Sequence, residues 1–218
     1  MKIINKILDL IYPPKCVFCH KLLKDGEKND ICSECEREIR ILRLDESKQS
    51  FKNIIMSIAP FYYEGKVKDA LHRYKFGGKS FYCKKFAKYM YIELMYSDIT
   101  PDIITWVPLS RKRLRSRGYG QAKLLADEIS KMTGIECRRL LIKKKNVRAQ
   151  SGMGNYSARE KNIKGAYVSC NDEFIRGKKI LLIDDIVTTG ATMSECAGVL
   201  LRASAAGVYT LTAARAKD

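Results

Sequence analysis

The stretch Ile180-Leu-Leu-Ile-Asp184-Asp185-Ile-Val-Thr188-Thr189-Gly190-Ala-Thr192 decides how this 218-residue chain folds. Its four leading apolar residues predict a buried strand, and two acids stand at the carboxyl end of that strand. A Thr/Gly turn then leads into a predicted helix from Thr192 to Ala203. Open α/β sheets bind ligands at the carboxyl ends of their strands, so this segment is a candidate binding site.

The turn has the features of an anion site. Its backbone N–H groups lie at a predicted helix N-terminus, where unpaired donors and the helix dipole favour a phosphate. A glycine permits close approach of the ligand, and the threonine hydroxyls add donors. The residues expected to hold the phosphate are Thr188, Thr189, Gly190, Ala191 and Thr192.

The two acids need a different partner, because carboxylates repel a phosphate. Hydroxyl groups or a divalent cation suit Asp184 and Asp185, and a ribose bound together with Mg²⁺ supplies both. A phosphate site without ribose is the main alternative, and an ordinary strand–turn–helix is the other.

Further apolar segments extend the pattern in both directions. Short apolar runs predict strands at 103–107, 140–142 and 208–213, and three- and four-residue apolar spacing predicts helices at 67–76, 81–96 and 121–132. Residues 54–63 are predicted as a strand or edge hairpin, and 146–166 as a long loop of the kind that forms lids or binding loops. The alternation predicts an α/β fold: a mostly parallel sheet with helices on both faces.

Four of the eight cysteines form two Cys-x-x-Cys pairs, Cys16 with Cys19 and Cys32 with Cys35, separated by twelve residues. Each pair can supply two thiolates to one tetrahedral zinc ion. A segment of about 30 residues buries too little apolar surface to fold alone, so the zinc is expected to be structural. Disulfides are the alternative. The other four cysteines are expected to be small buried apolar residues.

The charge balance favours anionic partners. The chain has 41 Lys and Arg against 24 Asp and Glu, a net charge of +17, which suits nucleic acid, phosphorylated metabolites or membrane headgroups. Cations concentrate in 111–117 and 143–148, for which a merely solvated face is the alternative. No apolar run is long enough to span a membrane, and residues 1–12 are predicted as a short helix rather than a signal peptide. A cytoplasmic location is therefore expected.

The thirteen residues 180–192 resemble, over their full length, the phosphoribosyl pyrophosphate motif of type I phosphoribosyltransferases. The resemblance implies that Asp184 and Asp185 bind the ribose hydroxyls, that the turn binds the 5-phosphate, and that Mg²⁺ accompanies the ligand.

Other motifs, in chain order, are similar to those of the ComF family of competence-associated proteins. They are Tyr62-Tyr-Glu-Gly65, Ala70-Leu-His-Arg-Tyr-Lys-Phe-Gly-Gly-Lys79, Val107-Pro-Leu-Ser-Arg-Lys-Arg-Leu-Arg-Ser-Arg-Gly-Tyr-Gly-Gln121, and Arg148-Ala-Gln150 with Arg159 and Asn162, behind the cysteine module. Two positions depart from the family pattern: Gly120 replaces the usual Asn and Ala149 the usual Thr. Both departures bear on loops rather than on the motif at 184–192.

By this resemblance, residues 46–218 form a phosphoribosyltransferase-like domain with a small hood, and residues 1–45 a helix and zinc-ribbon-like module. The pyrophosphate loop would be Pro108, Leu109, Ser110 and Arg111, and residues 143–159 would close over it. Candidates for catalysis in that closing loop are Lys143, Arg148, Gln150 and Arg159. Lys75 and Lys79 are candidates for phosphate contact, and His72 is expected to be a packed residue rather than a base.

The resemblance also ties the family to natural transformation, in which it handles incoming single-stranded DNA with a helicase partner. Candidate nucleic-acid contacts are Arg73, Lys75, Arg113, Arg115 and Arg117. Nearby aromatics suit a stacking surface for single strands or, equally, a half-buried core: Tyr62, Tyr63, Tyr74 and Phe76.

Three functions follow, in order of expectation. The first is a competence protein that binds phosphoribosyl pyrophosphate and single-stranded DNA. The second is an active phosphoribosyltransferase acting on a base or amine, and the third a zinc-organised interaction module with a relic site. The sequence names no acceptor.

Overall fold

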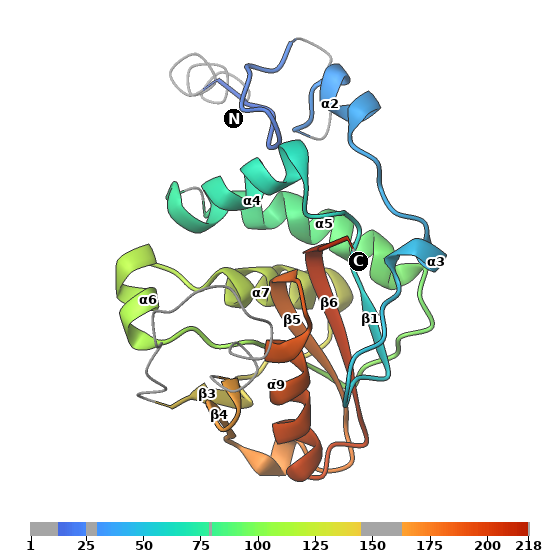
Figure 1. The fold of residues 1–218 in the computed structure, drawn as a ribbon, viewed down its shortest axis with the longest axis vertical. Coiled ribbons are helices and arrows are strands. Elements are labelled where there is room, and N and C mark those ends of the chain that lie inside the picture. Colours follow the sequence, from blue (N-terminus) through green and yellow to red (C-terminus); the bar gives the residue numbers. More distant parts are fainter. Residues whose placement is uncertain (1–12, 25–29, 79, 145–162, 218) are drawn as a thin grey trace.

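A four-stranded parallel sheet organises the protein. The computed structural model describes residues 13–24, 30–78, 80–144 and 163–217. Within them the sheet has the order β1 (Met56–Ile58), β6 (Gly207–Arg215), β5 (Lys179–Val187) and β2 (Ile103–Trp106), and every neighbouring pair is parallel (Figure 1). The parallel α/β fold predicted from the sequence is confirmed.

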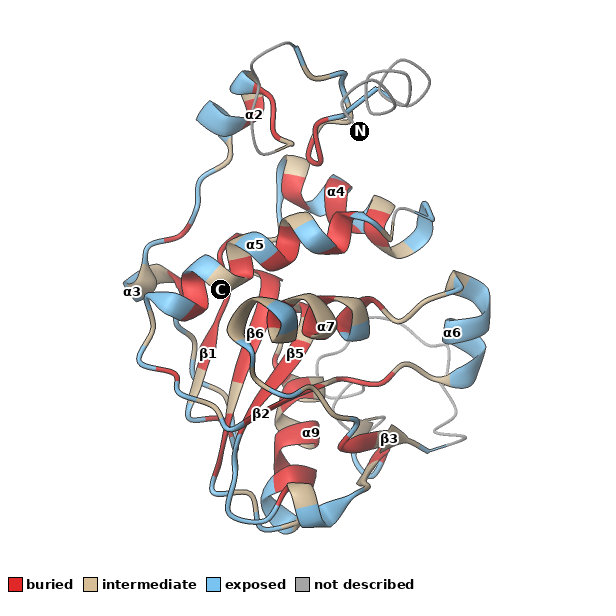
Figure 2. Ribbon diagram, turned by 180° about the vertical axis from the view of Figure 1, so that it is seen from behind, coloured by how far each residue is buried: buried red, intermediate tan, exposed pale blue. Residues whose placement is uncertain are grey.

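Helices cover both faces of this sheet, as predicted. On one face lie α5 (Tyr82–Met95) and α7 (Gln121–Thr133), and on the other α9 (Ala191–Arg202). Figure 2 shows the buried residues concentrated on the strands and on the inner sides of these helices. The helix α4 (Gly65–Phe76) lies beside α5 at the carboxyl edge of the sheet (Figure 1).

The central strand β5 is longer than its apolar run predicts. It continues past Ile183 through both acids to Val187, because β6 pairs along its whole length, with Asp184 opposite Thr212. Leu181 and Ile183 belong to the core under α5 and α7, whereas Ile180 and Leu182 belong to the core under α9. Since successive side chains of a strand alternate between faces, Asp185 continues the first series and Asp184 the second.

The segment predicted as a strand at 140–142 does form one, but its expected place in the alternating parallel sheet is wrong. The strand β3 (Leu141–Lys143) pairs antiparallel with β4 (Tyr167–Ser169) in a separate two-stranded sheet that packs against α9. Residues 54–63 supply the parallel strand β1 rather than a hairpin. The remaining elements are α2 (Ser33–Glu38), α3 (Leu44–Ser47), α6 (Arg111–Arg117) and a 3₁₀ helix, Asp172–Phe174.

The cysteine module is part of the same core as the sheet. The ring of Phe18, between the first two cysteines, contacts Phe61 and Phe86 edge-on, with ring centroids 5.6 and 6.1 Å apart. The two segments therefore share buried surface, and a domain boundary near residue 45 stays a prediction. In the described part of the chain no helix is long and apolar enough to cross a membrane.

The segment after α3 packs on the start of α9 at the turn 188–192, which we call the phosphate turn. The sequence does not predict this packing. Phe51 lies so close to Gly190 that a Cβ at that glycine would be 2.1 Å from Cδ1 of the ring. One turn further along α9, Asn53 Nδ2 donates to the carbonyl of Ser194 at 3.3 Å. Gly190 also has φ +70°, a left-handed conformation that glycine adopts without strain.

We predict that Gly190→Ala destabilises the protein more than a matched Gly→Ala change at a left-handed turn with open space. Gly177→Ala is that control, because its φ is +69° and no atom lies within 4 Å of the added Cβ. The control should cost about 1 kcal/mol of strain, and Gly190→Ala about 1–3 kcal/mol more from overpacking against Phe51. Urea unfolding measures both, and equal costs would contradict the packing described here.

Candidate functional site

The phosphate turn forms a small depression at the N-terminus of α9. Its volume is about 60 Å³, and it is lined by Asp184 and residues 186–193. Gly190 is the N-cap residue of α9, and Thr189 Oγ1 accepts a hydrogen bond from the N–H of Ala191 at 3.4 Å. The first N–H groups of a helix have no intrahelical acceptor, so the turn offers donors to an anion.

Asp185 faces α4 and forms an ion pair with Lys75 of that helix. Its Oδ1 lies 3.0 Å from Nζ of Lys75, which extends from the last turn of α4, and both side chains are mostly buried. Lys75 was predicted to contact phosphate or nucleic acid. In the structure its ammonium group neutralises one of the two acids of the motif.

Asp184 faces the opposite side of the sheet, toward α9 and the small sheet β3–β4. Burial of its carboxyl group and then the charge of Asp185 raise its pKa to about 7. The N–H of Asp185 donates to Asp184 Oδ1 at 2.8 Å. Lys143, a predicted catalytic candidate, lies on this side: its pKa is lowered by burial and by Arg113, and its Nζ donates to the hydroxyl of Tyr167 at 2.9 Å.

These two acids suit a magnesium ion that arrives with a phosphorylated ligand. Mg²⁺ in proteins binds to one or two carboxylates and completes its shell with substrate phosphates and water. Burial and, after it, repulsion by Asp185 make the charged form of Asp184 unfavourable, and a divalent cation bound beside the two acids would relieve that repulsion. Asp184 and Asp185 are therefore the residues that would hold Mg²⁺.

The loop after β2 ends at the same edge of the sheet. Val107 N–H donates to the carbonyl of Ile183 at 3.0 Å, which keeps β2 beside β5 up to this point. Pro108 is buried, Leu109 and Ser110 are half-buried, and Arg111 is exposed. Ser110 caps α6, its Oγ accepting from the N–H of Arg113 at 3.3 Å. A pyrophosphate contact by this loop stays a prediction.

The motif Arg117-Gly-Tyr-Gly-Gln121 clasps the end of α4, a role that the sequence does not reveal. Gln121 is buried; its Nε2 donates to the carbonyl of Lys75 at 3.4 Å, and its own carbonyl accepts from the hydroxyl of Tyr74 at 2.8 Å. Tyr119 donates its hydroxyl to the carbonyl of Tyr74, and Arg117 Nη1 donates to Gln121 Oε1 at 2.9 Å. The last turn of α4 is thereby fixed to the start of α7.

Three of the five cations predicted to contact nucleic acid have partners within the chain. Arg73 donates to the carbonyls of Val17 and Phe18 in the cysteine module, Lys75 pairs with Asp185, and Arg117 bonds to Gln121. Arg113 and Arg115 are exposed on α6.

Of the two roles left open for Tyr74, core residue or base stacking, its full burial fits the first. The expectation that His72 is packed is wrong. His72 is exposed and lies against the ring of Phe76, because its position on α4 faces away from the sheet. Lys79, Arg148, Gln150 and Arg159 lie outside the described residues.

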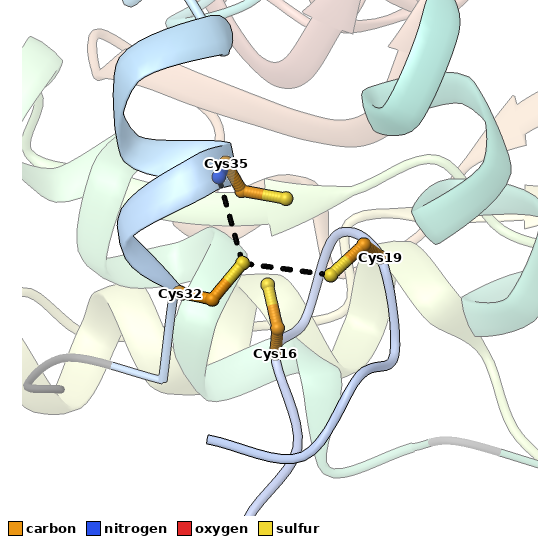
Figure 3. A group of neighbouring side chains, drawn as sticks. All are labelled: Cys16, Cys19, Cys32 and Cys35. Atoms are coloured by element: carbon orange, nitrogen blue, oxygen red, sulfur yellow. Dashed lines mark hydrogen bonds between the residues drawn. The ribbon is translucent and has the colours of Figure 1, made fainter. Parts of the chain in front are cut away.

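The four predicted zinc ligands converge. All the sulfur atoms of Cys16, Cys19, Cys32 and Cys35 lie within 4.8 Å of one another, as Figure 3 shows. Cys19 Sγ and Cys32 Sγ are 3.6 Å apart, close to the roughly 3.8 Å edge of a tetrahedron with zinc–sulfur bonds of about 2.3 Å. Two cysteines come from the turn 16–19 and two from the start of α2.

The electrostatics of this cluster also fit a bound cation. Burial raises the pKa of Cys16, but N–H groups of Cys19, Cys32 and Phe18 outweigh that effect and lower it to about 7. Burial and the neighbouring thiols raise the pKa of Cys35. Four adjacent thiolates would therefore repel one another without a metal ion. A zinc ion would supply the compensating positive charge, and four cysteines would leave it no open coordination position.

Two family models match the chain at the places where the structure has these features. The double zinc ribbon domain matches residues 7–46, and the phosphoribosyl transferase domain matches residues 114–218. The fold and the sites thus define a class: an α/β phosphoribosyltransferase-like protein with an N-terminal four-cysteine zinc ribbon.

Curated proteins similar to this chain are named for competence or for DNA utilization. Competence protein F of Haemophilus influenzae is 27% identical over 93% of this chain and 97% of its own, and competence protein ComFC of Bacillus subtilis is 26% identical over 85% and 72%. DNA utilization protein YhgH of Escherichia coli (strain K12) is 28% identical over 63% of this chain, and the match spans 62% of the YhgH length. Over most of its length the chain is thus similar to the ComF/YhgH competence and DNA utilization proteins.

Several solved structures match part of this chain at low identity. The allosteric regulatory enzyme of purine biosynthesis is 21% identical with a TM-score of 0.40, over 60% of this chain and 25% of that chain. Purine phosphoribosyltransferase from Pyrococcus horikoshii is 15% identical with a TM-score of 0.35, over 60% and 71%. The fold assignment rests on the sheet order and the family models.

We predict that Cys35→Ser removes zinc and lowers the melting temperature of the whole protein, because the cysteine module shares its core with α4 and α5. Cys170→Ser, which alters a cysteine outside the cluster, is the control and should keep its zinc. Metal analysis by mass spectrometry and thermal melting measure the two effects. Full zinc content and unchanged melting in Cys35→Ser would contradict the assignment.

Proposed function

We propose that the protein binds phosphoribosyl pyrophosphate with Mg²⁺ at the end of β5 and binds single-stranded DNA beside that site, as a competence protein in DNA uptake. One observation supports the first part most strongly. Two carboxylates lie near the end of the central strand, and a glycine turn at a helix N-terminus follows that strand, so acceptors for ribose hydroxyls lie near donors for a phosphate.

In this proposal the turn 188–192 holds the 5-phosphate and the acids hold the ribose. Because Asp184 and Asp185 point to opposite faces of the sheet, a ribose that contacts both lies across the end of the strand. Lys75 must then leave Asp185, and its ammonium group becomes available for the pyrophosphate. Bound Mg²⁺ would neutralise part of the charge on the pyrophosphate.

The nucleic-acid part is supported by α6 and by the relatives. The seven residues of α6 include several Arg and Lys side chains and no acid, and none of these residues is buried. The names of the relatives refer to competence and to DNA utilization. A helicase partner and a cytoplasmic location belong to the same proposal and come from the family resemblance.

A second candidate function is phosphoribosyl transfer, favoured by the match of residues 114–218 to the phosphoribosyl transferase domain. In such a step the C1–O bond to pyrophosphate breaks, a C1–N bond to a base or amine forms, and the proton of that nitrogen passes to a basic group or to water. Release of pyrophosphate in the presence of a nucleobase would favour this candidate over binding alone. The zinc-organised module with a relic site is the third candidate, and the intact acids and turn weigh against it.

We predict that Mg²⁺ with phosphoribosyl pyrophosphate binds to the wild type in isothermal titration, and that Asp184→Asn/Asp185→Asn weakens binding at least tenfold. The double substitution removes the two carboxylates that are proposed to bind the ribose hydroxyls and Mg²⁺. Asp98→Asn, an exposed acid before β2 at the other end of the sheet, is the control and should bind like the wild type.

Two further ligands separate the possibilities. Ribose 5-phosphate should compete for the site more strongly than inorganic phosphate if the acids recognise a ribose. A folded wild type that gives no heat with phosphoribosyl pyrophosphate would sink this part of the proposal.

We also predict that single-stranded DNA binds with a salt dependence that α6 sets. Arg113→Ala and Arg115→Ala should each make the slope of log affinity against log salt shallower by about 0.7, since each removes one phosphate contact. Arg176→Ala, an exposed arginine just before β5 at the amino edge of the sheet, is the matched control. Equal slopes in all four proteins would exclude α6 as the DNA contact.

A further inference from the structure

Phe76, at the end of α4, is a large apolar side chain that the core does not use. It is 61% exposed, and two neighbouring side chains contact its ring. The His72 ring centroid is 4.8 Å from that of Phe76 at an interplanar angle of 43°, and Cζ of Arg117 is 4.7 Å from the Phe76 centroid. We call these three side chains the Phe76 platform.

The backbone under the platform is fixed. Gly77 N–H donates to the carbonyl of Arg73 at 2.7 Å and caps α4, and Gln121 holds the carbonyl of Lys75. Arg117 is oriented by its bond to Gln121 Oε1. A ring presented by a rigid backbone loses little conformational entropy when a ligand stacks on it.

The surroundings of the platform are strongly positive. Arg117 is the last residue of α6, and none of the other cations of α6 forms a salt bridge with a described residue: Arg111, Lys112, Arg113 and Arg115. An exposed aromatic ring next to unpaired cations is the combination with which proteins bind single strands, because the ring stacks on a base while the cations contact phosphates. A duplex cannot use the ring in this way, since its base faces are already stacked.

We propose that the Phe76 platform stacks an unpaired base of a single-stranded nucleic acid whose phosphates lie along α6. The inference rests on the nucleic-acid part of the proposed function and names its stacking residue. The next residue toward the sheet, Lys75, contacts Asp185, so the bound strand passes beside the ribose acids. The position of the platform thus links the two proposed ligands.

The test is fluorescence anisotropy with a labelled oligothymidylate and with an abasic strand of equal length and charge. The wild type should bind the abasic strand more weakly, because base–aromatic stacking contributes about 1–3 kcal/mol, roughly 5- to 150-fold. Phe76→Ala should weaken binding of the normal strand by a similar factor and abolish the difference between the two strands. Phe76→Trp should restore it.

Tyr96→Ala is the matched control, since Tyr96 is a more exposed aromatic, 74%, that follows the last residue of α5. It should bind both strands like the wild type. Zinc content and melting curves establish that each variant is folded. The salt slope separates stacking from charge, because Phe76→Ala removes no phosphate contact and should leave the slope unchanged.

The outcomes distinguish this inference from the proposed function. If the wild type binds with a salt slope but does not discriminate the abasic strand, and Phe76→Ala binds equally well, the platform is refuted while nucleic-acid binding stands. If the wild type binds no strand, both fail. A single-stranded RNA that shows the same Phe76 dependence supports the inference for single strands in general. Phe76-dependent binding of an acidic peptide, with none of the strands, would overturn it in favour of a protein partner.

Discussion

The ion pair between Lys75 and Asp185 is the contact on which the arrangement of this protein depends. It joins α4 to the central strand β5 at the second of the two acids of the motif. Without a cation at that position, an unpaired buried carboxylate would stand beside Asp184, whose pKa is already raised by burial and by the charge of Asp185. The ligand-free protein thus neutralises with its own lysine the charge that a ribose and Mg²⁺ are proposed to use.

As a result, the last turn of α4 contacts both the cysteine module and the acid Asp185. Successive residues of its last turn have different partners: Arg73 holds the cysteine module, Tyr74 enters the core, Lys75 reaches the acid and Phe76 faces solvent. A change of partner for Lys75 on ligand binding acts on a helix whose neighbouring side chains contact the zinc ribbon and the proposed stacking surface. A zinc ion held by the four cysteines would therefore stabilise a module that contacts the same helix as Asp185.

Sequence reasoning found the parts of this protein that are encoded locally. The strand β5, the turn after it and α9 follow from an apolar run, a glycine and a helix start, and the zinc ligands follow from their spacing. It missed what depends on distant partners: β3 pairs with β4, and Phe51 packs on Gly190. The cations of α4 show the limit most clearly, because a lysine that is solvated and one that pairs with an acid 110 positions away look the same in a sequence.

The most direct test of the account is hydrogen–deuterium exchange of the amides in 188–192, followed with and without phosphoribosyl pyrophosphate and Mg²⁺. The account predicts that these N–H groups exchange more slowly in the complex, because they donate to the bound 5-phosphate. Pyrophosphate with Mg²⁺ alone, which lacks the ribose 5-phosphate group, should protect them less. Unchanged exchange at 188–192 in a saturated complex would show that the ligand binds elsewhere, and would contradict the phosphate turn as the centre of this site.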